Sequence, residues 1–313
     1  MDINARIFLA GHKGMVGSAL QRVLEREGYL DIVIATRQEV DLRDTTQVSN
    51  FFHRTNPEYV LLAAAKVGGI QANRQYPADF IYDNLMIQNN VIHQSYLSGV
   101  KKIMFLGSSC VYPKECAQPM KEDYLLTGPL ESTNEAYALA KISGLRMAQY
   151  YQKQYGLSCV CPMPSNLYGP NDSFDLEHSH VLSALVRRFT DAVDKGLSEI
   201  TLWGSGIARR EFLHVDDVAA AIIFLMNNWN SSEIINVGAG KDISIRELAG
   251  LIAEKVGFTG EIKWDTSMPD GMLRKCLDIS KLNSLGFVPK IALTDGIDQV
   301  IREYRAIKEN LKY

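Results

Sequence analysis

The stretch from residue 6 to residue 20, RIFLAGHKGMVGSAL, decides the fold class. A short apolar run ends at three glycines spaced three apart, Gly11, Gly14 and Gly17, and the chain then continues in a helical pattern. Glycines at such a strand-to-helix turn allow a tight bend and close approach of the backbone to a pyrophosphate, and the helix N-terminus favours its negative charge. We therefore expect a Rossmann-type unit that binds a dinucleotide at this turn.

Further apolar runs predict the remaining strands of the same sheet. They lie at 31–36, 59–65, 102–107 and 158–163, and longer helical patterns fill the intervals between them. Each run is nearly continuous in apolar character, as expected of strands that helices cover on both faces. The sequence thus predicts an α/β fold with a doubly wound parallel sheet.

The regular alternation loosens after residue 165, which predicts a change of domain. We expect a cofactor-binding domain at 1–165 and a smaller C-terminal substrate domain at 166–313. A helix at 215–228 and a strand at 233–238 are expected to return to the first domain, so that it also includes about 213–240.

Composition restricts the classes of partner. The 313 residues are 46% hydrophobic and 22% charged, with a net charge of −3, which gives no basic surface for nucleic acid. The apolar run before Gly11 is far shorter than the roughly 20 residues of a membrane span. The five cysteines lack the spacing of a disulfide framework, and no metal site is proposed. We expect a cytoplasmic protein without nucleic acid or membrane partners.

The end of the second predicted strand indicates the type of dinucleotide. It reads ATRQE, so Thr36 and Arg37 stand where a carboxylate usually binds the ribose of NAD. Because a guanidinium matches a 2′-phosphate, we predict NADP(H) as the cofactor. Lys13 is a candidate second cation near that phosphate. Asp41 and Leu42 are candidates for a contact with the adenine edge and for packing beneath it.

Three residues predict chemistry at a carbonyl or alcohol. Tyr137 and Lys141, in NEAYALAK, are four apart and share a helix face, and Ser108 follows the predicted strand 102–107. A nearby ammonium is expected to lower the pKa of a phenol from about 10, so that it exchanges a proton with the substrate oxygen. A serine hydroxyl can hold the same oxygen.

With the glycine turn and this Ser-Tyr-Lys set, the chain resembles the extended short-chain dehydrogenase/reductase family over essentially its whole length. NLYGP (166–170) and REFLHVDDVA (210–219) are similar to segments of that family. The resemblance implies an NADP-dependent oxidoreductase whose nicotinamide lies against Pro164, Asn166 and Leu167. Its implied cofactor contacts also include Met15, Val16, Leu106, Gly107, Ser109, Lys141 and His180.

Further motifs are similar to one group within that family. They are AAAKVGGI, GSSCVYP, SHVLSALVRRF, WGSG and PDGMLRKCLD. Members of this group epimerise C3 and C5 of a GDP-linked 4-keto-6-deoxy-hexose, GDP-4-keto-6-deoxy-D-mannose, and then reduce C4 with NADPH. The resemblance makes Cys110 the base of the epimerisation and His180 its acid, although His178 is close enough to be confused with it.

The same resemblance implies residues that bind the nucleotide sugar. They are Arg188, Trp203, Arg210, Asp270 and Lys275, with Arg274 as an alternative to Lys275. Arginine suits the diphosphate because its guanidinium forms two parallel hydrogen bonds with phosphate oxygens.

Other interpretations of the sequence stay open. The alternative activity is another nucleotide-sugar 4-epimerase, reductase or dehydratase of the family, although dehydratases have an acidic pair where this chain has Ser109 and Cys110. Cys110 also fits a small buried filler. The helical stretches 78–97 and 134–154 carry more apolar and aromatic residues than one buried stripe requires, which predicts a homodimer through these helices.

Overall fold

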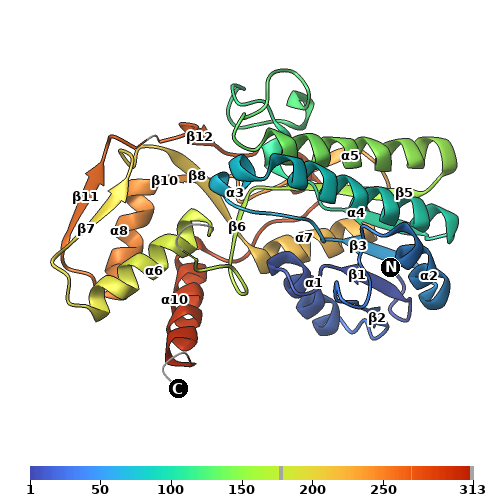
Figure 1. Cartoon of the computed structure of the whole chain (residues 1–313), viewed down its shortest axis with the longest axis horizontal. Helices are drawn as coiled ribbons and strands as arrows, with labels where there is room; N and C mark the ends of the chain where they lie inside the picture. Colours follow the sequence, from blue (N-terminus) through green and yellow to red (C-terminus); the bar gives the residue numbers. More distant parts are fainter. Residues whose placement is uncertain (176–178, 269, 311–313) are drawn as a thin grey trace.

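The computed structural model describes residues 1–175, 179–268 and 270–310. Its largest element is a six-stranded parallel sheet in the order β2-β1-β3-β4-β5-β9 (Figure 1). The strands are β1 (Ile7–Ala10), β2 (Ile32–Val33), β3 (Tyr59–Leu62), β4 (Lys102–Phe105), β5 (Ser158–Pro164) and β9 (Ile234–Val237). The predicted doubly wound parallel sheet is confirmed.

Several strands end earlier than the sequence indicated: β4 ends at Phe105 rather than at 107, and the differences are larger for β2 and β3. The second run, expected over 31–36, pairs with β1 only at Ile32–Val33, because Thr36 already begins a turn in which its carbonyl accepts the N–H of Val40 at 2.9 Å. The third run, expected over 59–65, leaves the sheet after Leu62. Residues 63–65, beyond β3, line the cavity at the carboxyl edge of the sheet, and beyond β2 Ala35 lines it.

Helices cover both faces of this sheet. On one face α4 (Pro77–Leu97) and α5 (Glu135–Tyr155) run side by side, with α2 (Thr45–Thr55) beside them; on the other lie α1 (Met15–Arg26) and α7 (Val215–Asn228) (Figure 1). Each face has its own apolar core, one around Phe8 and Phe105 and the other around Leu9 and Ile222.

The chain returns to the sheet late in the sequence. Helix α7 occupies the predicted range 215–228, and β9 pairs with β5, with Cys161 opposite Ile234. The structure thus has β9 in the large sheet, whereas the division into two domains near residue 165, with 213–240 in the first, stays a prediction.

The C-terminal part forms a smaller unit beside the sheet (Figure 1). Strands β6 (Asn166–Tyr168), β8 (Arg209–His214), β10 (Asp242–Ser244) and β12 (Arg274–Lys275) form a second sheet, and β7 (Glu199–Trp203) pairs with β11 (Glu261–Asp265). Helices α6 (Val181–Asp194), α8 (Ile245–Val256) and α10 (Leu293–Asn310) pack around a third core that includes Phe189. Short helices complete the chain: α3 (Ile70–Gln75), α9 (Ser280–Ser284), η1 (Ser109–Val111) and η2 (Glu122–Tyr124).

The order of the strands determines where a ligand can bind. The chain passes from β1 to β2 on one side and later to β3 on the other, so the carboxyl ends of β1 and β3 enclose the switch point at which open α/β sheets bind ligands. The glycine turn after β1 lies there. None of the helices in the described part of the chain combines the length and apolar character needed to cross a membrane.

Candidate active site

One cavity of about 2630 Å³ extends from the carboxyl edge of the large sheet to the C-terminal unit. Every residue selected above for the cofactor, the chemistry or the substrate lines it, with the exception of Lys13. Of the two alternatives, Arg274 is bound to Asp242 and does not line the cavity, and His178 lies outside the described residues. The residues predicted to bind the cofactor and those predicted to bind the substrate therefore share one cavity.

The glycine turn leaves room for a diphosphate at the start of α1. Gly11 has φ +92°, and a Cβ there would lie 2.7 Å from the Ala64 nitrogen; a Cβ at Gly17 would lie 2.0 Å from the Gly11 carbonyl oxygen. Gly14 caps the helix without a side-chain hydrogen bond, so the first backbone N–H groups of α1 stay available to an anion. These observations fit the pyrophosphate of a dinucleotide.

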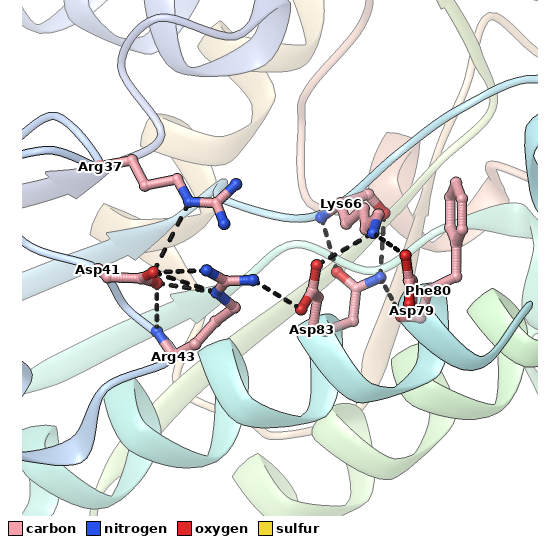
Figure 2. A network of polar contacts seen from close by, with 8 residues as sticks. Arg37, Asp41, Arg43, Lys66, Asp79, Phe80 and Asp83 are labelled. Carbon is pink, nitrogen blue, oxygen red and sulfur yellow. Dashed lines mark hydrogen bonds and ion pairs between the residues drawn. The ribbon is translucent and has the colours of Figure 1, made fainter. Parts of the chain in front are cut away.

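A network of charged side chains lines this cavity around Arg37 and Asp41 (Figure 2). Arg43 donates to Asp41 at 2.6 Å and to Asp83 at 3.0 Å, and Lys66 lies 3.1 Å from Asp83. The hydrogen bond from Arg43 lowers the pKa of Asp41 to about 2. Arg37 lies 3.7 Å from Asp41, and its side chain is 69% exposed.

Arg43 is therefore the main partner of the Asp41 carboxylate, and the exposed Arg37 guanidinium stays able to bind a phosphate. The sequence did not indicate Arg43, because one of the carboxylates that fix it, Asp83, lies 40 residues away on α4. This arrangement fits a 2′-phosphate next to Arg37.

Ser108, Tyr137 and Lys141 meet where β4 ends and α5 begins. The Tyr137 hydroxyl is hydrogen-bonded to Ser108, and burial raises the pKa of that phenol. Lys141 donates to the Leu106 carbonyl at 2.9 Å, and burial lowers its pKa to about 8. Its nitrogen lies 5.8 Å from the centre of the Tyr137 ring.

The expectation that Lys141 lowers the pKa of Tyr137 is therefore wrong for this arrangement. The ammonium lies over the ring rather than at the oxygen, so the desolvation of a buried phenolate outweighs its attraction. Tyr137 stays protonated at neutral pH and can donate a hydrogen bond to a substrate oxygen.

A small pocket of about 140 Å³ opens at these residues. Ser108 and Tyr137 line it together with Cys110 and His180, and Val67, Gly68, Asn73 and Asn134 complete its wall. Two groups that can hold a carbonyl oxygen and two that can exchange protons with carbon thus surround one space.

His180, the residue before α6, is bound to a buried carboxylate. Its Nδ1 lies 3.2 Å from Oδ1 of Asp172, and the other Asp172 oxygen accepts the Ser183 hydroxyl at 2.5 Å. This hydrogen bond with Asp172 raises the pKa of His180. The sequence analysis did not single out Asp172, although it lies in the quoted region directly after NLYGP.

Two asparagines of the small pocket were also missed. Asn73 donates both of its amide hydrogens to the carbonyls of Gly68 and Gly69, at 2.8 and 3.0 Å, so its side-chain oxygen is buried without a partner. Asn134 caps α5 without a side-chain hydrogen bond, and its oxygen is likewise unpaired. Both are acceptors suited to sugar hydroxyls, a role that only the folded arrangement indicates.

The opposite end of the cavity carries the groups predicted for the nucleotide. The Arg188 guanidinium lies 5.9 Å from the centre of the Trp203 ring, which is 65% exposed. Arg210 is desolvated, which lowers its pKa, and Asp270 accepts the N–H and the hydroxyl of Ser205, both at 2.7 Å. An exposed aromatic face beside the Arg188 guanidinium can bind a base, and arginines that line the same cavity can bind a diphosphate.

Lys275 is paired with Arg210 on the neighbouring strand, but its side chain is directed at the small pocket. Its Nζ is 3.8 Å from the Cys110 sulfur, at the small pocket.

Comparison with known proteins identifies what this arrangement is similar to. Residues 7–238 match the model of the NAD dependent epimerase/dehydratase family. The chain is 53% identical to GDP-L-fucose synthase 1 of Arabidopsis thaliana, over 97% of this chain and 94% of the plant protein. It is 50% identical to GDP-L-fucose synthase of Escherichia coli (strain K12), over 93% and 94% of the two chains. The crystal structure of a GDP-L-fucose synthetase from Naegleria fowleri bound to NADP superimposes with a TM-score of 0.90 at 28% identity, covering 99% of this chain and 96% of the other.

Proposed function

The chain belongs to the NAD dependent epimerase/dehydratase family, and we propose that it converts GDP-4-keto-6-deoxy-D-mannose to GDP-L-fucose. In this proposal the protein is both a 3,5-epimerase and an NADPH-dependent 4-reductase. The observation that supports it most directly is the small pocket, in which Cys110 and His180 lie on the wall that also contains Ser108 and Tyr137.

The epimerisation follows from the acidity of carbons next to a ketone. Removal of a proton from C3 or C5 places the charge of the resulting enolate on the C4 oxygen. Ser108 and Tyr137 hold that oxygen, and their hydrogen bonds strengthen as charge develops on it. Cys110 takes the proton from one face of the ring, and His180 returns a proton to the other face, which inverts the carbon.

The reduction uses the same grip on the C4 oxygen. NADPH, when bound, supplies the hydride that adds to C4. Tyr137 donates the proton to the oxygen, consistent with the raised pKa that keeps its phenol protonated at neutral pH. The Lys141 ammonium lies over the ring of Tyr137, and its hydrogen bond to the Leu106 carbonyl holds it there.

The remaining residues position the two ligands. We assign the 2′-phosphate to Arg37, the diphosphate of the cofactor to the glycine turn, and the nicotinamide to the wall formed by Pro164, Asn166 and Leu167. Arg188, Trp203 and Arg210 are assigned to GDP, since they line the far end of the cavity.

The alternative is a 4-epimerase, simple reductase or dehydratase acting on another nucleotide sugar. A simple reductase needs no acid–base pair next to the carbonyl, so the positions of Cys110 and His180 favour the epimerase/reductase. Product analysis separates these activities.

We also propose a homodimer and a cytoplasmic location. Tyr82 on α4 and Tyr150 on α5 are 61% and 63% exposed, which gives the helix pair an aromatic outer face suited to a second copy. The five cysteines are all free thiols, the form that a reducing compartment maintains.

The experiment supplies the purified protein with NADPH and GDP-4-keto-6-deoxy-D-mannose in deuterated water. We expect NADPH oxidation, a product inverted at C3 and C5, and deuterium at both carbons. A product reduced at C4 with retained configuration and no deuterium would assign the protein to the simple reductases instead.

A further inference from the structure

Lys275 is directed at the sulfur of Cys110. It lies on β12, which runs parallel to β8 with Lys275 opposite Arg210. Neighbouring residues of a strand face opposite sides, and here Arg274 binds Asp242 while Lys275 faces the cavity. Its Nζ is 3.8 Å from the Cys110 sulfur. Among the described residues no carboxylate lies within ion-pair distance of this ammonium.

The proposed epimerisation needs a starting state that ordinary side chains do not favour. A base must begin as a thiolate and an acid as an imidazolium, yet thiols titrate near 8.5 and imidazoles near 6.5. Between these two values an unperturbed pair is a neutral thiol and a neutral imidazole. The protein must therefore stabilise both charged forms at once.

The structure supplies one charged partner for His180, which is Asp172, and another for Cys110, which is Lys275. Asp172 raises the pKa of His180 and so maintains the acid. We propose that Lys275 is a positioning residue that maintains Cys110 as a thiolate and orients it toward the ring. This proposal rests on the proposed function, which makes Cys110 the base.

The other groups around the sulfur are consistent with this assignment. Tyr137, from α5, is neutral at working pH, and Ser108 accepts the N–H of Cys110 at 3.3 Å. His180, at the start of α6, shares the small pocket and is positive when protonated. Lys275 and, when protonated, His180 thus place positive charge at the thiol, and Lys275 is in direct contact with it.

Lys275 lies next to the sulfur in the step that removes a proton from carbon. The thiolate takes a proton from C3 or C5, so an S–H bond forms while a C–H bond breaks. The electron pair of that bond moves into the enolate. Lys275 exchanges no proton in this step and loses only its anionic partner, which the next deprotonation of the thiol restores.

The test measures the thiolate directly and needs no sugar. The full-length protein is treated with iodoacetamide over a range of pH, and alkylation of the peptide that contains Cys110 is followed by mass spectrometry. Lys275→Met is expected to move the midpoint of this profile upward by about one pH unit, which corresponds to a roughly tenfold slower alkylation near pH 7. Lys275→Arg should stay near the wild type.

Two controls separate the possible outcomes. Arg274→Met, on the same strand but bound to Asp242, should leave the profile unchanged. NADPH affinity equal to wild type shows that Lys275→Met is folded. A profile of Lys275→Met that superimposes on the wild type overturns the proposal, and so does a rise in KM for the sugar nucleotide without any shift, since that assigns Lys275 to the diphosphate.

The proposed function has a separate readout. If the alkylation midpoint shifts but no deuterium enters C3 or C5, the contact between Lys275 and Cys110 stands and the assignment of the activity fails. If both hold, Lys275→Met should lower the rate of deuterium incorporation about tenfold at pH 7 with little change in KM.

Discussion

Oδ1 of Asp172 lies 3.2 Å from Nδ1 of His180, and the carboxylate is fixed from its other side by the hydroxyl of Ser183. The pair raises the pKa of His180, so the imidazolium persists to a higher pH than in a free histidine. An acid with a raised pKa loses its proton only as pH rises through that value. In the proposed mechanism, the Asp172 contact thus extends toward alkaline pH the range in which His180 can act as the acid.

Asp172→Asn should move the alkaline limb of the epimerisation rate to lower pH. Without the carboxylate, the imidazolium loses its stabilisation, and we expect the limb to move to lower pH with a loss of rate at the alkaline end. At acid pH, where His180 is protonated in either protein, the rates should converge. Deuterium incorporation at C3 and C5 measures this profile. Ser183→Ala is the control. An alkaline limb of the pH–rate profile that does not move in Asp172→Asn would show that His180 is not the acid.

Arg37→Ser should weaken NADPH binding selectively. A charged hydrogen bond to phosphate contributes about 1.5–3 kcal/mol, so the Kd for NADPH is expected to rise at least tenfold while that for NADH changes little. Fluorescence titration of both nucleotides gives the two values. Lys13→Met should have a small effect, since Lys13 does not line the cavity. Equal losses for NADPH and NADH would place the 2′-phosphate away from Arg37.

Gly17→Ala should disrupt the cofactor turn. The added methyl would lie 2.0 Å from the Gly11 carbonyl oxygen, and that backbone cannot yield without moving the turn. We expect a loss of about 2 kcal/mol or more in the free energy of unfolding, together with loss of NADPH binding. Gly250→Ala is a matched control inside α8, where a Cβ meets nothing within 4 Å, and it should stabilise by about 0.5–1 kcal/mol. Urea unfolding gives both values, and a Gly17→Ala protein that binds NADPH normally would contradict the argument.

Replacing both Tyr82 and Tyr150 by glutamate should produce a monomer. Charges placed on the aromatic outer face of α4 and α5 would repel or remain unpaired in a symmetric interface. Light scattering should give half of the wild-type mass. Leu30→Glu, at a side chain 85% exposed next to β2, is the control and should keep the wild-type mass. A double variant of unchanged mass would move the interface to another surface.

The sequence predicted local features well because they depend on neighbouring residues. The range of helix α7 followed from apolar periodicity and the glycine turn from spacing, whereas no local pattern fixed the return of β9 to the large sheet. Residues beyond β2 and β3 were assigned to strands because apolar runs continue after the pairing stops. Of those residues, Ala35 and 63–65 line the cavity.

Contacts between distant segments were not predictable in the same way. Cys110 and Lys275 are 165 residues apart, and nothing in either segment indicates the other. The pKa of Tyr137 was expected to fall because Lys141 shares its helix face. That spacing does not indicate that the phenol is buried, and burial raises its pKa. Burial and charge at a site follow from tertiary packing, which spacing alone does not contain.

The late return of β9 to the large sheet has a consequence for truncated forms of the protein. A fragment that stops at residue 165 would lack both β9 and α7, leaving the outer hydrogen-bonding edge of β5 unpaired and one apolar face of the sheet partly uncovered. Unprotected strand edges pair with other chains. Such a fragment is expected to self-associate instead of yielding an independent nucleotide-binding module, so the integrity of the first half of the chain depends on completion of the second.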